Sequence, residues 1–390
     1  MTSSDSNHGV ARFDDLVRGE SWQFSDCEGI SVAERPDQVC SVLREVDSAV
    51  SRGWWAFGFV SYEAASALDP TLLTHAPAGG LPFAWFGISR GPVRTSRLAR
   101  PDRRRYRLGE WATPWSEREY HRRVQLVRDR IGIGETYQCN LTTRLSTSFG
   151  GQPYALYTDL ALAQQAAYNA YLDAGRFVIA SASPELFFEW VGDTVHMRPM
   201  KGTARRGSTA GEDSQMAQWL LSSQKDRAEN IMIVDLIRND VARLADFGGV
   251  SVRSLCRLER YPSVYQLTSE VVARLAPGRA IGLREVFAAL FPCGSVTGAP
   301  KSRTMQLIRE VEESPRGVYC GAIGMVAPRT NAFRARFSVA IRTATIDRRD
   351  NTLTYGAGSG ITWLSDAAAE YDEISQKTAV LRGLVDNVST

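Results

Sequence analysis

Closely spaced strand signals, with few helices between them, constrain the fold of this chain most strongly. Apolar runs typical of strands occupy 176–181, 185–191 and 194–200, and Gly192-Asp193 between the last two is typical of a hairpin turn. Hairpins join antiparallel strands, whereas parallel neighbours need a long crossover, usually a helix. Because hairpins outnumber such crossovers along the chain, the sequence predicts an α+β fold with large antiparallel sheets rather than a doubly wound fold.

The other elements are predicted from apolar periodicity and from turn residues. Ser116 begins a helix that ends near Gly132, and Glu119 stands where a capping box would place it. Further helices are predicted at 212–222, 225–245, 282–291, 300–313 and 366–384. Further strands are predicted at 53–65 (continuing into a turn or helix start), 81–88, 136–147, 249–256, 264–275, 318–327, 333–346 and 352–357.

Composition narrows the class of protein. With 390 residues, of which 44% are hydrophobic and 23% charged, the chain can bury a sizeable core. Six scattered cysteines without a Cys-x-x-Cys pair suggest neither a disulfide framework nor a thiolate metal site. A net charge of +3 gives little support for nucleic-acid binding. The chain shows no secretory signal pattern and no apolar run of about 18 residues, so we expect a cytoplasmic protein that does not enter the membrane.

Lysine is rare in this chain and is placed selectively. Only four of the 46 Lys and Arg residues are lysines, and each lies in a motif-like segment: Lys201, Lys225, Lys301 and Lys377. A chain that uses arginine for almost every positive charge has reason to keep a lysine where a site needs a compact ammonium or a nucleophilic amine. Surface lysines that fall near glycines and acids by chance are the alternative interpretation.

Pairs of acids recur at helical spacing. Residues three apart lie on one helical face, so two predicted helices could each direct two carboxylates to a shared point: Asp226 with Glu229, and Glu370 with Glu373. Hard oxygen donors in a chain with only four histidines suggest Mg²⁺. Ordinary surface acids paired with Arg227 or Lys377 would explain the same spacing.

Two glycine-rich segments, 294–302 and 356–360, resemble nucleotide-binding motifs but depart from their spacing. Closely spaced glycines can still let backbone N–H groups converge on an anion such as a carboxylate, although a tight turn is an equal alternative. Lys201 follows a strand end and could act as a nucleophile if cations or desolvation lowered its pKa. Glu185, on the neighbouring strand of the hairpin, could face the same cleft as a proton shuttle, or be a buried structural acid.

Together these segments resemble the chorismate-utilising enzymes, which include anthranilate synthases, aminodeoxychorismate synthases, isochorismate synthases and salicylate synthases. The resemblance covers about 116–385, with a weaker signal at Gly58–Glu63. It depends on ordered motifs, which include Tyr137-Gln-Cys-Asn-Leu141, Ser183-Pro-Glu185, Pro199-Met-Lys-Gly-Thr203, Lys225-Asp-Arg-Ala-Glu-Asn230, Thr297-Gly-Ala-Pro-Lys301, Ala340-Ile-Arg-Thr343, Gly356-Ala-Gly358 and Glu370-Tyr-Asp-Glu373.

The resemblance implies two large antiparallel sheets packed face to face with helices outside. It implies an N-terminal segment over 1–100, a connector over 101–115 and a catalytic domain over 116–385 that is intertwined with the N-terminal part. It also implies that Glu229 and Glu373 hold Mg²⁺, with Glu370 and Asp226 beside them. The substrate chorismate would be held at Arg342, Tyr319, Gly321, Thr297, Gly358, Ser359, Gly360, Lys377 and Gln138, while Lys201 and Glu185 would be catalytic.

Lys201 and Gln138 decide between members of the family. Isochorismate and salicylate synthases carry a water-activating lysine at the position of Gln138, so the resemblance disfavours water addition. Aminodeoxychorismate synthases carry a lysine at the position of Lys201, where anthranilate synthases usually have alanine. Anthranilate synthases also tend to carry a histidine in the segment Tyr261-Pro-Ser263. The resemblance therefore implies a transferase that forms 4-amino-4-deoxychorismate for 4-aminobenzoate and folate synthesis, through a covalent Lys201 adduct.

The sequence contains no glutaminase nucleophile turn, so the resemblance implies a separate glutamine amidotransferase partner that supplies ammonia. We also expect release of aminodeoxychorismate, since the chain has no room for a pyridoxal-phosphate lyase. Two alternatives are an anthranilate synthase component I and a catalytically inactive homologue that binds chorismate or an aromatic amino acid and regulates a partner.

Overall fold

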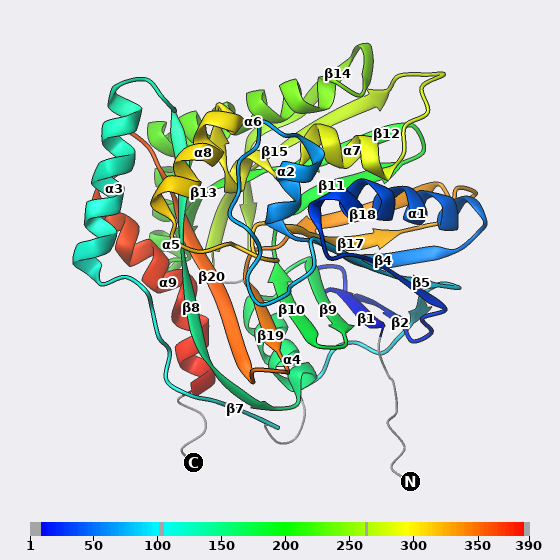
Figure 1. The fold of residues 1–390 in the computed structure, drawn as a ribbon. Helices are drawn as coiled ribbons and strands as arrows, with labels where there is room; N and C mark the ends of the chain where they lie inside the picture. The colour runs from blue at the N-terminus through cyan, green and yellow to red at the C-terminus, as the bar shows by residue number, and fades with distance from the viewer. Residues whose placement is uncertain (1–8, 101–104, 262–263, 386–390) are drawn as a thin grey trace.

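Two large antiparallel sheets form the centre of the molecule in the computed structural model, which describes residues 9–100, 105–261 and 264–385 (Figure 1). Sheet A runs in the order β16 (Gly298–Ala299), β8 (Gln138–Gly151), β20 (Thr352–Ile361), β19 (Thr343–Asp347), β10 (Phe177–Ser183), β9 (Tyr168–Ala174), β1 (Val10–Asp15), β2 (Glu20–Phe24) and β6 (Val93–Arg94), and β7 (Tyr106–Leu108) pairs with β8.

Sheet B runs in the order β13 (Met200–Arg205), β15 (Val264–Leu275), β12 (Thr194–Arg198), β11 (Leu186–Val191), β18 (Phe333–Val339), β17 (Ala322–Val326), β4 (Trp55–Val60), β5 (Ala84–Ser89) and β3 (Gly29–Ala33), and β14 (Ala245–Arg260) pairs with β15. Every strand pair between described residues is antiparallel, as the hairpin pattern predicts.

The inner faces of the two sheets pack on each other through large apolar side chains. Phe13 and Leu172 of sheet A share one buried cluster with Phe57, Trp85 and Ile323 of sheet B. Strands before residue 100 contribute to both sheets: β1, β2 and β6 lie in sheet A, and β3, β4 and β5 lie in sheet B. The expected connector contains β7, which pairs with β8, while residues 101–104 lie outside the described part of the chain.

Helices cover the outer faces of this sandwich. They are α1 (Val39–Ser51), α2 (Ala65–Leu68), α3 (Glu117–Gly132), α4 (Pro153–Gln164), α5 (Ala210–Ser222), α6 (Gln224–Ala242), α7 (Leu283–Leu290), α8 (Lys301–Val311) and α9 (Ala367–Val385), with short 3₁₀ turns at Pro36–Gln38, Tyr62–Ala64 and Gly294–Val296. Figure 1 shows α1, α6 and α7 over sheet B and α4 against sheet A, and buried apolar clusters join them there. Among the described helices, none is both long and apolar enough to cross a membrane.

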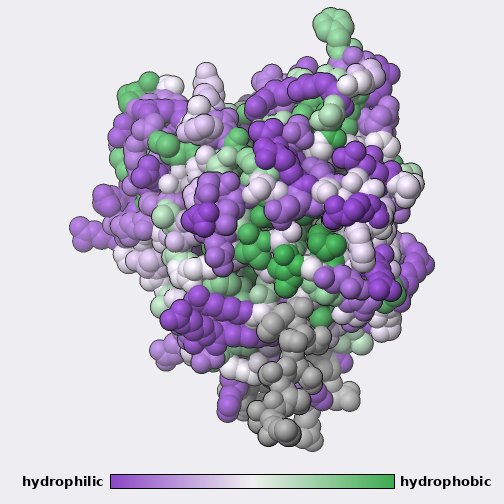
Figure 2. All heavy atoms as spheres, turned by 45° about the vertical axis from the view of Figure 1, so that its right-hand side comes forward, coloured by the Kyte–Doolittle hydropathy of each residue, from purple (hydrophilic) through white to green (hydrophobic). Residues whose placement is uncertain are grey.

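Polar side chains cover most of the face of the molecule seen in Figure 2. Figure 2 shows apolar side chains gathered in a central patch on one face, with hydrophilic residues around it.

Several sequence predictions need correction. The single strand expected at 333–346 is wrong, because Val339 ends β18 in sheet B and Thr343 begins β19 in sheet A. Helix α4 was not expected, since side chains around its whole circumference are apolar or buried and leave no amphipathic period. The capping box at Ser116 is half formed: the Ser116 hydroxyl accepts the N–H of Glu119 at 3.2 Å, but the Glu119 carboxylate pairs with Arg122.

Candidate active site

Two chain segments that cross between the sheets lie side by side and place Glu185 and Arg342. Glu185 stands between β10 of sheet A and β11 of sheet B, and Arg342 stands between β18 and β19. The Ala182 N–H donates to the Arg342 carbonyl at 3.0 Å, and the Val339 N–H donates to the Glu185 carbonyl at 3.1 Å. Arg342 adopts a left-handed backbone conformation with φ of 52°, which turns the chain between the sheets. The Glu185 and Arg342 side chains therefore both start from the place where the chain crosses between the two sheets.

Glu185 is an acid held in an apolar setting. Its side chain is buried, and its Oε1 has no hydrogen-bond partner among the described residues. Burial raises the pKa of Glu185 to about 7, although the Ser295 hydroxyl and the Lys201 ammonium oppose this rise. A carboxyl group with this pKa can both hold and release a proton near neutral pH.

Lys201 reaches the same region from the edge strand of sheet B. A register shift between Met200 and Thr203 and a positive φ of 84° at Gly202 bend β13 next to the lysine. A Cβ atom at Gly360 would come within 3.1 Å of the Lys201 Nζ and 2.6 Å of the Gln138 Nε2. The ammonium of Lys201 therefore lies over the backbone of β20, beside Gln138, and within electrostatic reach of Glu185.

The acids predicted at helical spacing lie on α6 and α9. Glu229, Glu370 and Glu373, which we call the carboxylate cluster, interact electrostatically with the same lysine, Lys225. Glu229 is buried, and its Oε1 has no hydrogen-bond partner in the described structure. Burial raises the pKa of Glu229 to about 7, against the influence of Lys201 and Lys225. The two helices thus bring the predicted carboxylates into one neighbourhood.

Lysines neutralise the rest of the carboxylate cluster. The Lys225 Nζ donates to Glu370 Oε1 at 3.1 Å, and the Ser365 hydroxyl donates to the same oxygen at 2.6 Å. Lys377 lies 2.6 Å from Glu373 Oε1 and also donates to the Gly358 carbonyl at 2.6 Å. Burial alone would raise the pKa of Glu373, but the contact with Lys377 outweighs it and lowers that pKa.

The donor chemistry of the carboxylate cluster fits Mg²⁺. Carboxylate oxygens are the ligands that this ion prefers, and the buried Oε1 of Glu229 has no hydrogen-bond partner among the residues that the structure describes. No three His, Cys, Asp or Glu side chains of the described residues stand close enough to hold a metal ion together. Lys225 and Lys377 instead balance the negative charge, so the cluster can assemble around a cation only after these lysines and the carboxylates separate.

Asp226 has a different environment from the other predicted metal ligands. Its carboxylate accepts a hydrogen bond from the Ser223 hydroxyl, which also caps the first turn of α6. A Cβ atom at Gly202 would lie 2.8 Å from the Asp226 Cβ, so this acid packs against the strand that carries Lys201. In this arrangement Asp226 orders the start of α6 next to Lys201.

Several predicted substrate-binding residues meet around β20. The Arg342 Nη1 donates to the Lys377 carbonyl at 2.9 Å. The Tyr319 ring packs so closely on Gly356 that a Cβ atom there would lie 2.2 Å from a ring carbon. Burial holds the pKa of Tyr319 well above its ordinary value, so its hydroxyl remains a donor at neutral pH.

Other predicted contacts have different surroundings. The Ser359 hydroxyl bonds to the Tyr120 hydroxyl at 2.8 Å on the α3 side of β20. Because successive residues of a strand point to opposite faces, only the backbone of Ser359 can contribute to the face of β20 on which Gly360 lies. The Thr297 hydroxyl donates to the Cys293 carbonyl at 3.1 Å. Gly321 adjoins the Val60 carbonyl, which a Cβ atom would approach to 2.2 Å. These three positions shape the backbone around the site.

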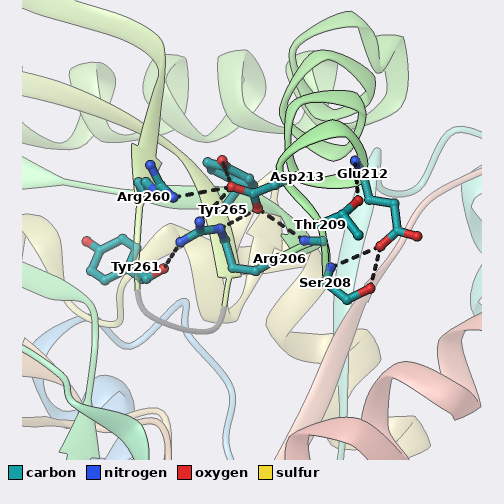
Figure 3. Close-up of polar contacts among 9 residues, drawn as sticks. Arg206, Ser208, Thr209, Glu212, Asp213, Arg260, Tyr261 and Tyr265 are labelled. Carbon is teal, nitrogen blue, oxygen red and sulfur yellow. Dashed lines mark hydrogen bonds and ion pairs between the residues drawn. The ribbon is translucent and has the colours of Figure 1, made fainter.

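Arg206, Asp213 and Tyr265 form a polar clamp that fixes the chain after Lys201. Figure 3 shows Arg206 gripping Asp213 of α5 with both its Nε and Nη2 at 2.6 Å, while Tyr265 donates to Asp213 at 2.8 Å. The contact with Arg206 holds the pKa of Asp213 well below its usual range. The Arg206 Nη1 also donates to the Tyr261 carbonyl at 3.0 Å, so the clamp joins α5 to β14 and β15. Pro262 and Ser263, which belong to the segment where anthranilate synthases tend to carry a histidine, lie outside the described residues.

Ser295 and Lys225 are site residues that the sequence patterns did not predict. Ser295 lies in the glycine-rich segment 294–302, whose glycines give the stronger signal, and it is buried next to Glu185. Lys225 had a usable signal, because it is one of the chain's four lysines. Its contact with Glu370 joins residues 145 positions apart, which no local pattern reveals.

Comparisons with known proteins identify relatives of the chain. A family model described as chorismate binding enzyme matches residues 5–383. The chain is 34% identical over 357 residues to the aminodeoxychorismate synthase of Streptomyces griseus, a match that covers 90% of this chain and 44% of that protein. It is 38% identical over 274 residues to anthranilate synthase component 1 of Neisseria meningitidis, covering 70% of this chain and 54% of that protein. The chain spans about half the length of these relatives.

A solved structure shares the fold. Anthranilate synthase component I from Streptococcus pneumoniae superposes with a TM-score of 0.76 at 24% sequence identity, and the match covers 97% of this chain and 93% of that one. This similarity confirms the predicted fold class of two antiparallel sheets with helices outside.

Proposed function

The chain belongs to the chorismate binding enzyme family, and from this premise we propose that it aminates chorismate at C4 to give 4-amino-4-deoxychorismate. The observation that carries the proposal is the position of Lys201. Its ammonium lies over Gly360 next to Gln138, within electrostatic reach of Glu185. A lysine beside a buried carboxyl group offers a nucleophile and an acid in one site.

We propose the following division of roles. Lys201 acts as the neutral amine, after its ammonium has lost a proton to solvent. The amine nitrogen forms a bond to C2 of chorismate, the ring double bonds shift, and the C4–O bond breaks. Glu185 gives its proton to the departing C4 hydroxyl, which leaves as water. Ammonia then forms a bond to C4, the double bonds shift back, and the C2–N bond to Lys201 breaks. A proton from the added nitrogen returns to Glu185, so both residues end in their starting state and the enolpyruvyl group is retained.

Arg342, Lys377 and Tyr319 are the proposed donors to the substrate carboxylates. Lys377 and Arg342 already contact each other beside Gly358, so their positive charge lies next to the glycine-rich strand β20. Glu229, Glu370 and Glu373 would hold Mg²⁺, with Asp226 beside them at the start of α6, the helix that carries Glu229. When bound, Mg²⁺ would supply positive charge for a substrate carboxylate.

Ammonia is proposed to come from a glutamine amidotransferase partner. Relatives such as the protein of Salmonella typhimurium are named aminodeoxychorismate synthase component 1, a name that implies a second component. An ammonium salt would replace this partner in an assay, because only free ammonia enters the proposed chemistry.

A second candidate is the anthranilate synthase reaction. Relatives with that name are as similar to the chain as those named aminodeoxychorismate synthase, with 38% identity for the Neisseria meningitidis protein. The test is mass spectrometry of the product formed from chorismate, MgCl₂ and an ammonium salt at mildly alkaline pH. A product that keeps the enolpyruvyl group and has one hydroxyl replaced by an amine supports the proposal, whereas anthranilate with free pyruvate supports the second candidate. Chorismate binding by calorimetry without turnover would support an inactive homologue.

A further inference from the structure

Lys225 is a lysine to which the proposed chemistry gives no role. Lys201 and Lys377 belong to the proposed site. Lys301 lies outside it and donates to the Asp240 carboxylate at 2.6 Å. Lys225 instead extends from the first turn of α6 to the first turn of α9, where its Nζ lies 3.1 Å from Glu370 Oε1. The Glu370 side chain is only 3% exposed, whereas that of Lys225 is 40% exposed. The ammonium therefore covers a buried carboxylate from the solvent side.

The local helix gives no reason for a lysine at this position. The first turn of a helix carries a partial positive charge, which favours acids and disfavours cations. Lys225 lies two residues after the N-cap Ser223, within this first turn. The carboxylates provide the compensating attraction, because Lys225 interacts with Glu370 most strongly and also with Glu229 and Glu373.

We propose that Lys225 is an internal counter-cation that occupies the carboxylate cluster of Glu229, Glu370 and Glu373 until a divalent cation displaces it. The inference rests on the proposed metal site, but not on which nitrogen chemistry follows. In the described part of the chain, Glu229 Oε1 is buried without a hydrogen-bond partner, and Glu370 keeps its Ser365 hydrogen bond if the lysine leaves. Departure of Lys225 would thus free carboxylate oxygens for the cation while Ser365 still orients Glu370.

The choice of lysine over arginine fits a group that must move. Arginine supplies nearly every other positive charge in this chain and binds carboxylates through a rigid two-pronged contact. Lysine is a point charge on a flexible stem and makes a single contact here, with one oxygen of Glu370. The partly exposed side chain can turn into solvent without disturbing the core.

The test compares the affinity of wild-type protein and Lys225→Met for MgCl₂ by calorimetry, and for Mn²⁺ by electron paramagnetic resonance. Methionine keeps the length of the stem and removes the charge. We expect Lys225→Met to bind either ion about tenfold more tightly, since the ion no longer competes with a charge-assisted hydrogen bond. Lys225→Arg, which keeps the charge, is expected to bind no more tightly than wild type.

Thermal unfolding without metal provides a second readout. We expect metal-free Lys225→Met to melt below wild type, because its carboxylates repel one another, and to gain more from added MgCl₂. Lys301→Met is the matched control, since it also removes a contact between a lysine and a carboxylate but leaves the carboxylate cluster intact; its Mg²⁺ affinity should equal that of wild type. If Lys225→Met does not fold, Lys225→Gln takes its place.

Unchanged or weaker affinity in Lys225→Met would overturn the inference, and so would failure of both proteins to bind either ion at millimolar concentration. The product assay tests the proposed function separately. Anthranilate as product would overturn C4 amination, but Lys225→Met would still bind Mg²⁺ more tightly than wild type. Equal Mg²⁺ affinities of Lys225→Met and wild type would overturn the role of Lys225, but the product would stay the same.

Discussion

At the scale of single residues, Lys201 has both a reactive amine and a position near a proton-carrying group. Its amine has the reach of a nucleophile, and Glu185 supplies a nearby group that can carry a proton. The close approach of Lys201 and Gln138 to Gly360 leaves no space for a side chain on β20 at this point. Small changes at these positions should therefore act on chemistry more than on stability.

Removal of the amine is the first prediction at this scale. We expect Lys201→Ala to lower the ammonium-dependent rate of 4-amino-4-deoxychorismate formation by at least about 100-fold, because the proposed covalent adduct forms through the amine of Lys201. Lys201→Arg is the control, since it keeps the positive charge without a nucleophilic amine and should be equally slow. Mass spectrometry would also detect diversion to C2 amination. An unchanged rate and product in Lys201→Ala would contradict the covalent step.

The pH dependence of Glu185 is the second prediction. Burial raises its pKa from the ordinary 4.5 to about 7, so the carboxyl group keeps its proton up to that pH. Above about pH 7 the proton on Glu185 becomes about tenfold scarcer per pH unit, while the neutral Lys201 amine becomes more abundant, so the rate should rise below that pH and level off above it. The measurement is kcat/KM at several pH values, divided by the concentration of free ammonia. Glu185→Gln should be slow at every pH and should not level off at pH 7; a wild-type rate that keeps rising about tenfold per pH unit from pH 7 to 9 would exclude Glu185 as the acid.

At the scale of elements, helix α3 shows how far a local signal extends. Ser116 caps the helix as predicted, but Glu119 forms ion pairs with Arg122 and Arg123 instead of returning a hydrogen bond to Ser116. The cap depends on neighbouring residues only, whereas Arg123 is held in place by α8 through the Val311 carbonyl. Two arginines of the same helix therefore take the Glu119 carboxylate from the expected capping box, and α8 holds one of them in place.

The cap itself can be tested by stability. We expect Ser116→Ala to lower the free energy of unfolding by about 1 kcal/mol, because the Glu119 N–H loses its acceptor at the helix start. Urea unfolding of the two proteins measures the difference, and Ser116→Asp should stay near wild type since aspartate also caps helices. Equal stability of Ser116→Ala and wild type would show that the cap contributes nothing here.

At the scale of the whole molecule, Arg316 joins distant parts of the chain. Its side chain is buried and donates to Glu312 at 2.6 and 2.8 Å, to the Val296 carbonyl at 2.7 Å and to the Asn140 carbonyl at 2.7 Å. Its backbone N–H donates to Glu63 of the N-terminal part at 2.7 Å. The residues around the site therefore depend on contacts between segments far apart in sequence.

We expect Arg316→Met to destabilise the protein by about 3–5 kcal/mol, because Glu312 would remain as a buried charge without its partner. Chemical unfolding measures this loss. The double variant Arg316→Met with Glu312→Gln should recover part of it, since the unpaired charge is removed while the amide oxygen can still accept the Thr142 N–H. A loss below about 1 kcal/mol in the single variant would mean that the buried pair is not a major support of the fold.

The sequence by itself determined the elements whose signals are local: the β11–β12 hairpin at Gly192-Asp193, the start of α3 and the acids on one face of α6 and of α9. Tertiary structure alone decided the break between β18 and β19, the buried helix α4 and the contact of Lys225 with Glu370. Hydrophobic period and turn chemistry act over a few residues and can be read along the chain. Sheet crossing, complete burial and pairing of distant charges depend on which surfaces meet after folding, so no local pattern carries them.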